Sequence, residues 1–342
     1  MDMPTLLAWR ATNRSNYADV RSELQSSLHR LLADFVPSPP ALLSLVTRTR
    51  ALLSGEFALC YLLRDDSFVP YSLDIYVGSV WFDVFIDSFG VSRELSGYQT
   101  TWTSNNFDDR HVDTRHVTDS LDISLSNGRS IIIHAAASSS ACHAIACSPS
   151  SLGTTFVTEF SFATAYPRLT FSRRAIVCYA LLAESSPSEI DAYQRIRNNG
   201  FSFEEDPASW TEYSGEQYSG VELPPFDCLR SLYMCPQQGR YFGDEGSMVC
   251  FMDTLSVDVT LLKDRCIPPY GIMAVWRLPS SVACDAQCDE FDDILAPGVL
   301  VTSLMFEDES FKATTRPGLT LIGCTNASGR RDRYARARSV TL

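Results

Sequence analysis

The chain has 342 residues, 45% hydrophobic and 20% charged, which is typical of a globular protein with a substantial core. The formal net charge is -13, which disfavours non-specific binding to nucleic acid or to an acidic membrane, because both require a basic surface. No run approaches the ~18 consecutive apolar residues of a membrane-spanning helix, and residues 1–10 lack a secretory pattern. We expect a cytoplasmic or nuclear protein, with neither membrane nor nucleic acid as a partner.

The N-terminal part has the pattern of a helical layer. Leucines recur at three- and four-residue steps over residues 4–36, and Asn13 and Ser15 interrupt them, which predicts two helices. A proline-rich break then precedes a third predicted helix over residues 41–53.

Residues 51–88 form the stretch around which the chain is organised. It begins with a turn at Ser54-Gly55, continues with an apolar segment and a loop that ends at Pro70, and then predicts a strand over residues 73–77. An amphipathic helix over residues 81–89 follows. This order places Asp74 at the head of the strand, after a glycine turn.

The clearest hairpin covers residues 121–136. Ile123 and Leu125 alternate with polar residues, and Asn127-Gly128 predicts a tight turn with positive φ angles. The other segments up to residue 162 are predicted as a strand (97–102), a polar loop (104–116), an irregular segment (137–151), and either a strand or a buried helical turn (155–162).

The C-terminal half is predicted to be richer in strands. A helix over residues 188–198 has a serine N-cap and a glycine C-cap at Gly200. A loop is predicted over residues 206–218, followed by strands over residues 255–262, 272–278, 299–306 and 319–323. The expected division is a helical segment (1–50), a core (51–200), a β-rich part (201–325) and a basic disordered tail (326–342).

The candidate site combines a glycine turn with carboxylates. Nucleotidyl transfer uses divalent metal held by two or three carboxylates on adjacent strands, while a glycine turn at a helix start offers N–H groups to phosphate. The candidate catalytic residue is Asp74, and the candidate nucleotide-binding residues are Gly55 and Ser72. The position for a third carboxylate, on the returning hairpin strand, has none. Asp122 and Glu56 are therefore alternative metal ligands, and Mg²⁺ is expected only if the protein is catalytic.

Residues 51–136 resemble the core of the polymerase-beta-like nucleotidyltransferases, through the segment LDIYV at residues 73–77. Together with FVTEFSF...AYPRLTFSRRA (156–175) and CPQQGRYFGDEGS (235–247), much of the chain resembles a group of uncharacterised basidiomycete fungal proteins. Many members of that group begin with a segment similar to an F-box remnant, which residues 4–36 resemble. The resemblance implies a nucleotidyltransferase-like fold whose activity is reduced or lost.

Other chemistries find less support in the residue pattern. The 11 cysteines are odd in number and irregularly spaced, so buried thiols are favoured over a zinc site made by Cys228, Cys235, Cys250, Cys284 and Cys288. A solvated loop is favoured over an ion site at His111 and His116. The motifs of phosphate-binding loops, dinucleotide-binding folds and serine hydrolases are absent.

The sequence therefore predicts an α+β protein, with a helical N-terminal layer on a nucleotidyltransferase-like mixed sheet and a β-rich C-terminal part. Three functions remain open. The first is a non-catalytic scaffold or protein-interaction module with an unidentified protein partner and possible nucleotide binding. The second is a divergent metal-dependent nucleotidyltransferase that uses Asp74. The third is an F-box-type adaptor, which requires the N-terminal helices to expose an apolar groove.

Overall fold

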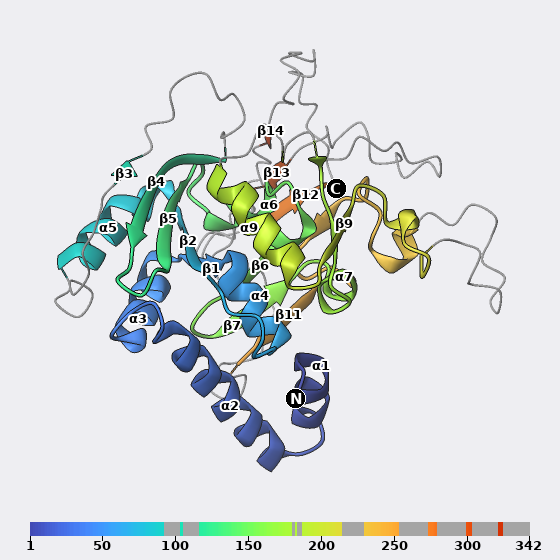
Figure 1. The fold of residues 1–342 in the computed structure, drawn as a ribbon, viewed down its shortest axis with the longest axis horizontal. Helices are drawn as coiled ribbons and strands as arrows, with labels where there is room; N and C mark the ends of the chain where they lie inside the picture. Colours follow the sequence, from blue (N-terminus) through green and yellow to red (C-terminus); the bar gives the residue numbers. More distant parts are fainter. Residues whose placement is uncertain are drawn as a thin grey trace, which may run out of the picture.

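The structure is a computed structural model, and it has the expected α+β architecture with helices beside a mixed sheet (Figure 1). It describes residues 1–91, 103–104, 116–179, 182, 187–213, 229–252, 273–278, 299–302 and 321–323. The predicted strand over residues 97–102, the predicted strand over residues 255–262 and the basic tail lie outside these ranges.

Three helices form the N-terminal layer, as the leucine spacing predicts. They are α1 (Met3–Arg10), α2 (Arg14–Leu32) and α3 (Pro39–Thr49). The side chain of Asn13 accepts a hydrogen bond from a backbone N–H in the first turn of α2, so Asn13 separates the first two helices as its N-cap.

The third helix ends earlier than predicted. Arg50 adopts a left-handed conformation (φ 57°) that stops α3, and Leu53 pairs with Ile75 on one side and Val157 on the other. Residues Leu52–Ser54 are therefore strand β1 rather than the end of a helix. Pairing with two neighbouring strands overrides the helical spacing of the leucines.

The large sheet has eight strands in the order β11-β7-β6-β1-β2-β5-β4-β3. Besides β1 they are β2 (Ser72–Gly78), β3 (Thr103–Ser104), β4 (Val117–Ser124), β5 (Ser130–Ala136), β6 (Thr155–Val157), β7 (Ser161–Thr164) and β11 (Met248–Phe251). Strands β2 and β5 are parallel, and the other pairs are antiparallel. The segment over residues 155–162, for which the sequence predicts either a strand or a buried helical turn, lies in the β6–β7 hairpin.

The C-terminal part both completes the large sheet and builds a second one. Strand β11 adds to β7, while a separate four-stranded sheet has the order β10-β12-β13-β14. Its strands are β10 (Arg240–Tyr241), β12 (Met273–Trp276), β13 (Val299–Thr302) and β14 (Leu321–Gly323). A small parallel pair joins β8 (Arg174–Ile176) to β9 (Ser202–Glu204).

The remaining helices connect these strands. They are α4 (Gly55–Leu63), η1 (Ser79–Trp81), α5 (Phe82–Val91), α6 (Ala141–Ala146), η2 (Ser151–Gly153), α7 (Pro167–Phe171), α9 (Pro187–Asn198), η3 (Pro207–Ser209) and η4 (Leu229–Leu232). Helix α6 corrects the prediction of an irregular segment over residues 137–151. The hydroxyl of Ser140 accepts a hydrogen bond from Cys142 N, and all six residues of α6 are buried, so packing supports a helix that the small residues alone do not predict.

The predicted hairpin is present as β4 and β5, but its turn differs in detail. Only Gly128 has a positive φ (81°), and Asn127 does not. The N–H of Leu125 donates to the carbonyl of Arg129 at 2.8 Å, which closes a loop longer than two residues. Asn127 instead donates from its side chain to the carbonyl of Asp34, so the turn is tied to the end of α2.

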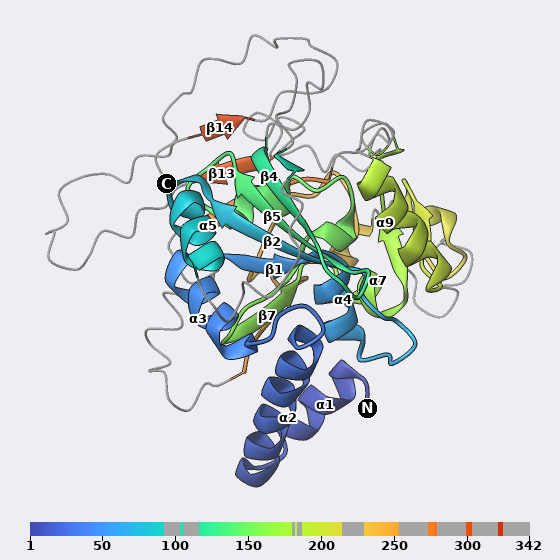
Figure 2. The ribbon, with the colours of Figure 1, turned by 60° about the vertical axis from the view of Figure 1, so that its left-hand side comes forward.

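The main core lies between the N-terminal helices and one face of the sheet. Figure 2 shows α3 and α5 beside strands β1 and β2, on the side where this core lies. Its fully buried members include Leu24 and Leu28 of α2, Leu42 of α3, Ile75 of β2 and Met252 after β11. The N-terminal helices and the segment that follows β11 therefore share one core.

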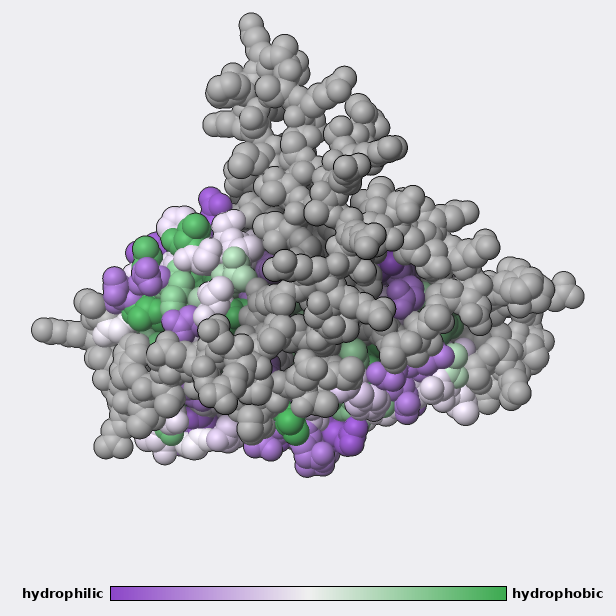
Figure 3. All heavy atoms as spheres, turned by 90° about the horizontal axis from the view of Figure 1, so that it is seen from above, coloured by the Kyte–Doolittle hydropathy of each residue, from purple (hydrophilic) through white to green (hydrophobic). Residues whose placement is uncertain are grey.

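The surface seen from above in Figure 3 mixes apolar and polar side chains on the side where α5 lies. Two exposed valines belong to this side of the fold, Val80 in η1 and Val84 in the first turn of α5. Among the described helices, none combines the length and the apolar character that crossing a membrane demands.

Candidate functional site

Alternation along three neighbouring strands gives the sheet one apolar and one polar face. Leu73, Ile75 and Val77 of β2 point into the main core, so their neighbours Ser72, Asp74 and Tyr76 point to the opposite side. We define the polar face as Ser72, Asp74 and Tyr76 of β2, Ile132 and His134 of β5, and Ser120 and Asp122 of β4.

One row of the polar face contains both predicted metal ligands. The pairing register places Ser54 opposite Asp74, Asp74 opposite Ile132, and Ile132 opposite Asp122. Since neighbouring strands lie about 4.8 Å apart, the backbones of Asp74 and Asp122 are about 10 Å apart. The position without a carboxylate in the sequence therefore holds an isoleucine that separates the two acids.

Asp74 lies against the turn that begins α4. A Cβ on Gly55 would come within 1.9 Å of Asp74 Oδ2, and Gly55 has a φ of 67°, so both its space and its backbone favour glycine. The hydroxyl of Ser72 donates to the same oxygen at 3.1 Å. His134 Nε2 lies 3.5 Å from the other carboxylate oxygen. The structure thus brings Gly55, Ser72 and Asp74 together, as the candidate site requires.

Asp122 faces the same side as Asp74 and is electrostatically coupled to it. Partial burial raises the pKa of Asp122, the negative charge of Asp74 raises it further, and His134 acts in the opposite direction. Its Oδ1 atom is buried, and within the described ranges no hydrogen-bond donor reaches it. An unsatisfied carboxylate oxygen on the same face as a second carboxylate is a place where a cation would be stabilised.

Glu56 is not available as the replacement metal ligand that the sequence suggested. Its side chain is 2% exposed, and Arg195 of α9 donates from Nε to its Oε1 at 2.8 Å. The backbone N–H of Tyr71 donates to its Oε2 at 2.9 Å. Burial nevertheless raises the pKa of Glu56, and Arg195 opposes that shift. Both oxygens are thus engaged, and the carboxylate does not stand free in front of the Gly55 turn.

Helix α9 lies beside the polar face at two points. Burial raises the pKa of the Tyr76 hydroxyl most, the charge of Asp74 comes next, and Glu189 near the start of α9 and Tyr193 in its middle are close enough to add to the shift. Near the other end, Arg195 reaches Glu56. The ring of Tyr76 stacks on His134 with a centroid distance of 4.5 Å. The polar face is therefore bordered by a helix that follows the core in sequence.

The two aspartates fit a shared divalent cation only in part. No three His, Cys, Asp or Glu side chains in the described ranges are grouped closely enough to hold a metal ion. Mg²⁺, however, is commonly bound through one or two carboxylates, with water and the phosphates of a bound nucleotide as the other ligands. Asp74 and Asp122 match that smaller requirement.

Sequence reasoning missed three residues of the site. His134 stands in the predicted returning strand two positions after Ile132, so strand alternation identifies the face it shares with Asp74. Tyr71 immediately precedes the predicted strand. Arg195 had no local signal, because its proximity to Glu56 depends on how α9 packs against α4.

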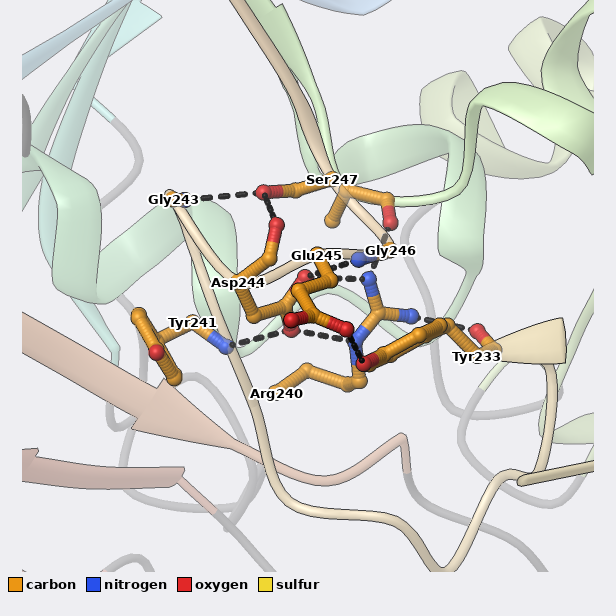
Figure 4. A network of polar contacts seen from close by, with 9 residues as sticks. Tyr233, Arg240, Tyr241, Gly243, Asp244, Glu245, Gly246 and Ser247 are labelled. Carbon is orange, nitrogen blue, oxygen red and sulfur yellow. Dashed lines mark hydrogen bonds and ion pairs between the residues drawn. The ribbon is translucent and has the colours of Figure 1, made fainter. Parts of the chain in front are cut away.

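The glycine-rich segment at residues 239–247 takes part in a network of polar contacts around Arg240 (Figure 4). Arg240 is fully buried, and its guanidinium donates from Nε and Nη2 to the two carboxylate oxygens of Asp244 at 2.6 and 3.0 Å. It also donates to the carbonyls of Tyr233 and Ala165. Every nitrogen of Arg240 has a partner, so this network supports the fold and offers no phosphate cradle.

The other metal candidates are only partly described. Cys235 is buried and Cys250 is partly exposed, while Cys228, Cys284, Cys288 and His111 lie outside the described residues.

Comparisons with protein-family models, with curated proteins and with solved structures found no match for this chain. The resemblance to nucleotidyltransferases therefore stays a prediction.

Proposed function

We propose that this protein is a nucleotidyltransferase-like binding module, which takes up a cation-bound nucleotide on its polar face without two-metal nucleotidyl transfer. The observation that supports this function is the row Asp74, Ile132, Asp122. Two-metal catalysis needs carboxylates that serve two ions about 3.5–4 Å apart. Here an isoleucine separates the two acids, and Glu56 is engaged elsewhere.

Binding of one cation requires less than catalysis does. Asp74 and Asp122 would hold the ion, and the turn at Gly55 would face the phosphates from the start of α4. In this proposal a protein partner binds the form of this protein that carries the nucleotide. The exposed valines Val80 and Val84 offer apolar surface for that contact. The adaptor hypothesis is not proposed, because the apolar faces of α1, α2 and α3 pack in the main core.

The second candidate is the divergent nucleotidyltransferase that uses Asp74. The unpartnered buried oxygen of Asp122 favours it, since this oxygen would complete a one-ion site beside Asp74. A bound cation would neutralise the charge on the phosphates and polarise the phosphoryl group.

The test is the melting temperature with ATP, GTP, CTP or UTP, each with and without Mg²⁺ or Mn²⁺. A hundredfold excess of ligand over its Kd stabilises a protein by about 2.7 kcal/mol, so we expect a rise of several degrees. The rise should be lost in Asp74→Asn and reduced in Asp122→Asn. Asp87→Asn, an exposed carboxylate on α5, is the matched control. A flat response of the wild-type protein to all ligands would refute the proposal.

Release of pyrophosphate from the same nucleotides separates the two candidates. We expect none above the rate of Asp74→Asn. Release by the wild-type protein that Asp74→Asn abolishes would support the transferase instead.

A further inference from the structure

Arg195 is held on two sides before any ligand arrives. Its Nε donates to Glu56 Oε1 at 2.8 Å, and its guanidinium carbon lies 4.4 Å from the centroid of the Tyr71 ring. Tyr71 also donates its backbone N–H to the second oxygen of Glu56. The side chain is therefore pre-organised, which lowers the entropic cost of any further contact that it makes.

The donors that remain on Arg195 are those of its two terminal nitrogens. A guanidinium has five N–H donors, and the ion pair with Glu56 engages Nε. Within the part of the chain that the structure describes, the terminal nitrogens have no hydrogen-bond partner. The side chain is 33% exposed, so part of it is open to solvent or to a ligand.

The position of Arg195 links it to the candidate site. Glu56 follows Gly55 directly, and Gly55 touches the carboxylate of Asp74. The charge of Asp74 also acts on Glu56. Arg195 is thus a fixed cation at the edge of a face whose other charged groups are mainly acidic.

We propose that Arg195 binds a phosphate group of the ligand, so that the site selects a cation–polyphosphate complex over a bare cation. This inference rests on the proposed function. A cation held by Asp74 and Asp122 presents the polyphosphate, and the paired N–H groups of an arginine suit phosphate oxygens. Glu56 and Tyr71 act as positioning residues, because they touch Arg195 and not the ligand.

The test uses inorganic tripolyphosphate with Mn²⁺, a probe without a base, and Mn²⁺ alone. Isothermal titration compares the wild-type protein with Arg195→Gln and Arg195→Lys. The lysine variant keeps a positive charge for the buried Glu56, so the fold is retained if glutamine perturbs it, but its donors all sit on one nitrogen and it lacks the planar pair of terminal N–H groups that suits phosphate oxygens. Arg197→Gln is the matched control, since Arg197 lies on the same helix and contacts the ring of Phe203 instead.

We expect both Arg195 variants to lose about tenfold or more in affinity for the Mn²⁺–tripolyphosphate complex, with unchanged affinity for Mn²⁺ alone. Arg197→Gln should bind both probes like the wild-type protein. Wild-type affinity for the complex in both Arg195 variants would overturn the inference and leave the proposed function intact. If the wild-type protein binds neither the complex nor any nucleotide, the proposed function fails together with the inference.

Discussion

Single residues define the polar face through contacts that span three strands and the start of α4. Asp74 meets Gly55 of the α4 turn, Ser72 of its own strand and His134 of the next strand. Asp122 lies one strand further on, with one oxygen buried and unpartnered. Burial and the negative charge of Asp74 raise the pKa of this second acid.

The raised pKa of Asp122 predicts an effect on how the stability of the protein depends on pH. Its pKa is raised in the folded protein above the ordinary value of 3.8, so the folded chain binds the proton more tightly than the unfolded chain does. The free energy of unfolding therefore falls as pH rises from about 3.8 through the raised pKa. Asp122→Asn removes that loss.

We expect Asp122→Asn to be at least as stable as the wild-type protein near about pH 7, and to lose this advantage towards about pH 4. Urea denaturation at a series of pH values measures it, with Asp87→Asn as an exposed control. If Asp122→Asn is less stable than the wild-type protein to the same extent at every pH, the ionised carboxylate makes a stabilising contact and the prediction is wrong.

At the scale of elements, the N-terminal helices belong to the core. Tyr61 of α4 donates its hydroxyl to the carbonyl of Leu24 in α2, and Arg10 at the end of α1 donates to the carbonyls of Phe251 and Met252. Helices α1 and α2 thereby connect α4, which follows the central strand β1, with β11 at the edge of the sheet.

Leu24→Ala tests this role of α2. Leu24 is 0% exposed, and deleting a fully buried leucine side chain costs about 2–5 kcal/mol through lost burial and a cavity. We expect the free energy of unfolding in urea to fall by that amount. The exposed Ser22→Ala on the same helix should stay within about 0.5 kcal/mol of the wild-type protein. Equal, small effects of the two substitutions would mean that α2 packs only loosely on the sheet.

At the scale of the whole molecule, the two sheets are joined by the Arg240 network. Arg240 belongs to β10 of the smaller sheet and donates to the carbonyl of Ala165, which follows β7 of the larger sheet. The guanidinium carbon of Arg240 lies 4.6 Å from the centroid of the Tyr166 ring and 5.3 Å from that of the Tyr233 ring. One buried arginine therefore links two sheets that share no strand.

Arg240→Met should be strongly destabilising. It leaves Asp244, whose side chain is 8% exposed, as an uncompensated buried charge, and breaking such a pair costs about 3–5 kcal/mol. The double variant Arg240→Met/Asp244→Leu should recover part of the loss, because it removes both charges. Urea denaturation measures both variants. A cost in Arg240→Met no larger than that of a surface substitution would show that the two sheets are held together by other contacts.

The sequence predicts the helices and strands to a different extent from the residues of the candidate site. The helices at the N-terminus, the β4–β5 hairpin and the helix ending before Gly200 follow from residue spacing and caps, which are local properties. Strand β1 and helix α6 do not, because pairing partners and burial decide them. The candidate residues Gly55, Ser72, Asp74 and Asp122 follow from the sequence, because a glycine turn and carboxylates on predicted strands are the features that nucleotidyl transfer uses.

The residue pattern alone predicts the α+β class and the carboxylates Asp74 and Asp122 on two of the central strands. The tertiary structure sets the polar face and places Ile132 between Asp74 and Asp122, because strand register depends on pairing across the sheet. It also decided that Glu56 is engaged by Arg195. These two residues are 139 positions apart, and no local pattern relates them until α9 packs beside α4.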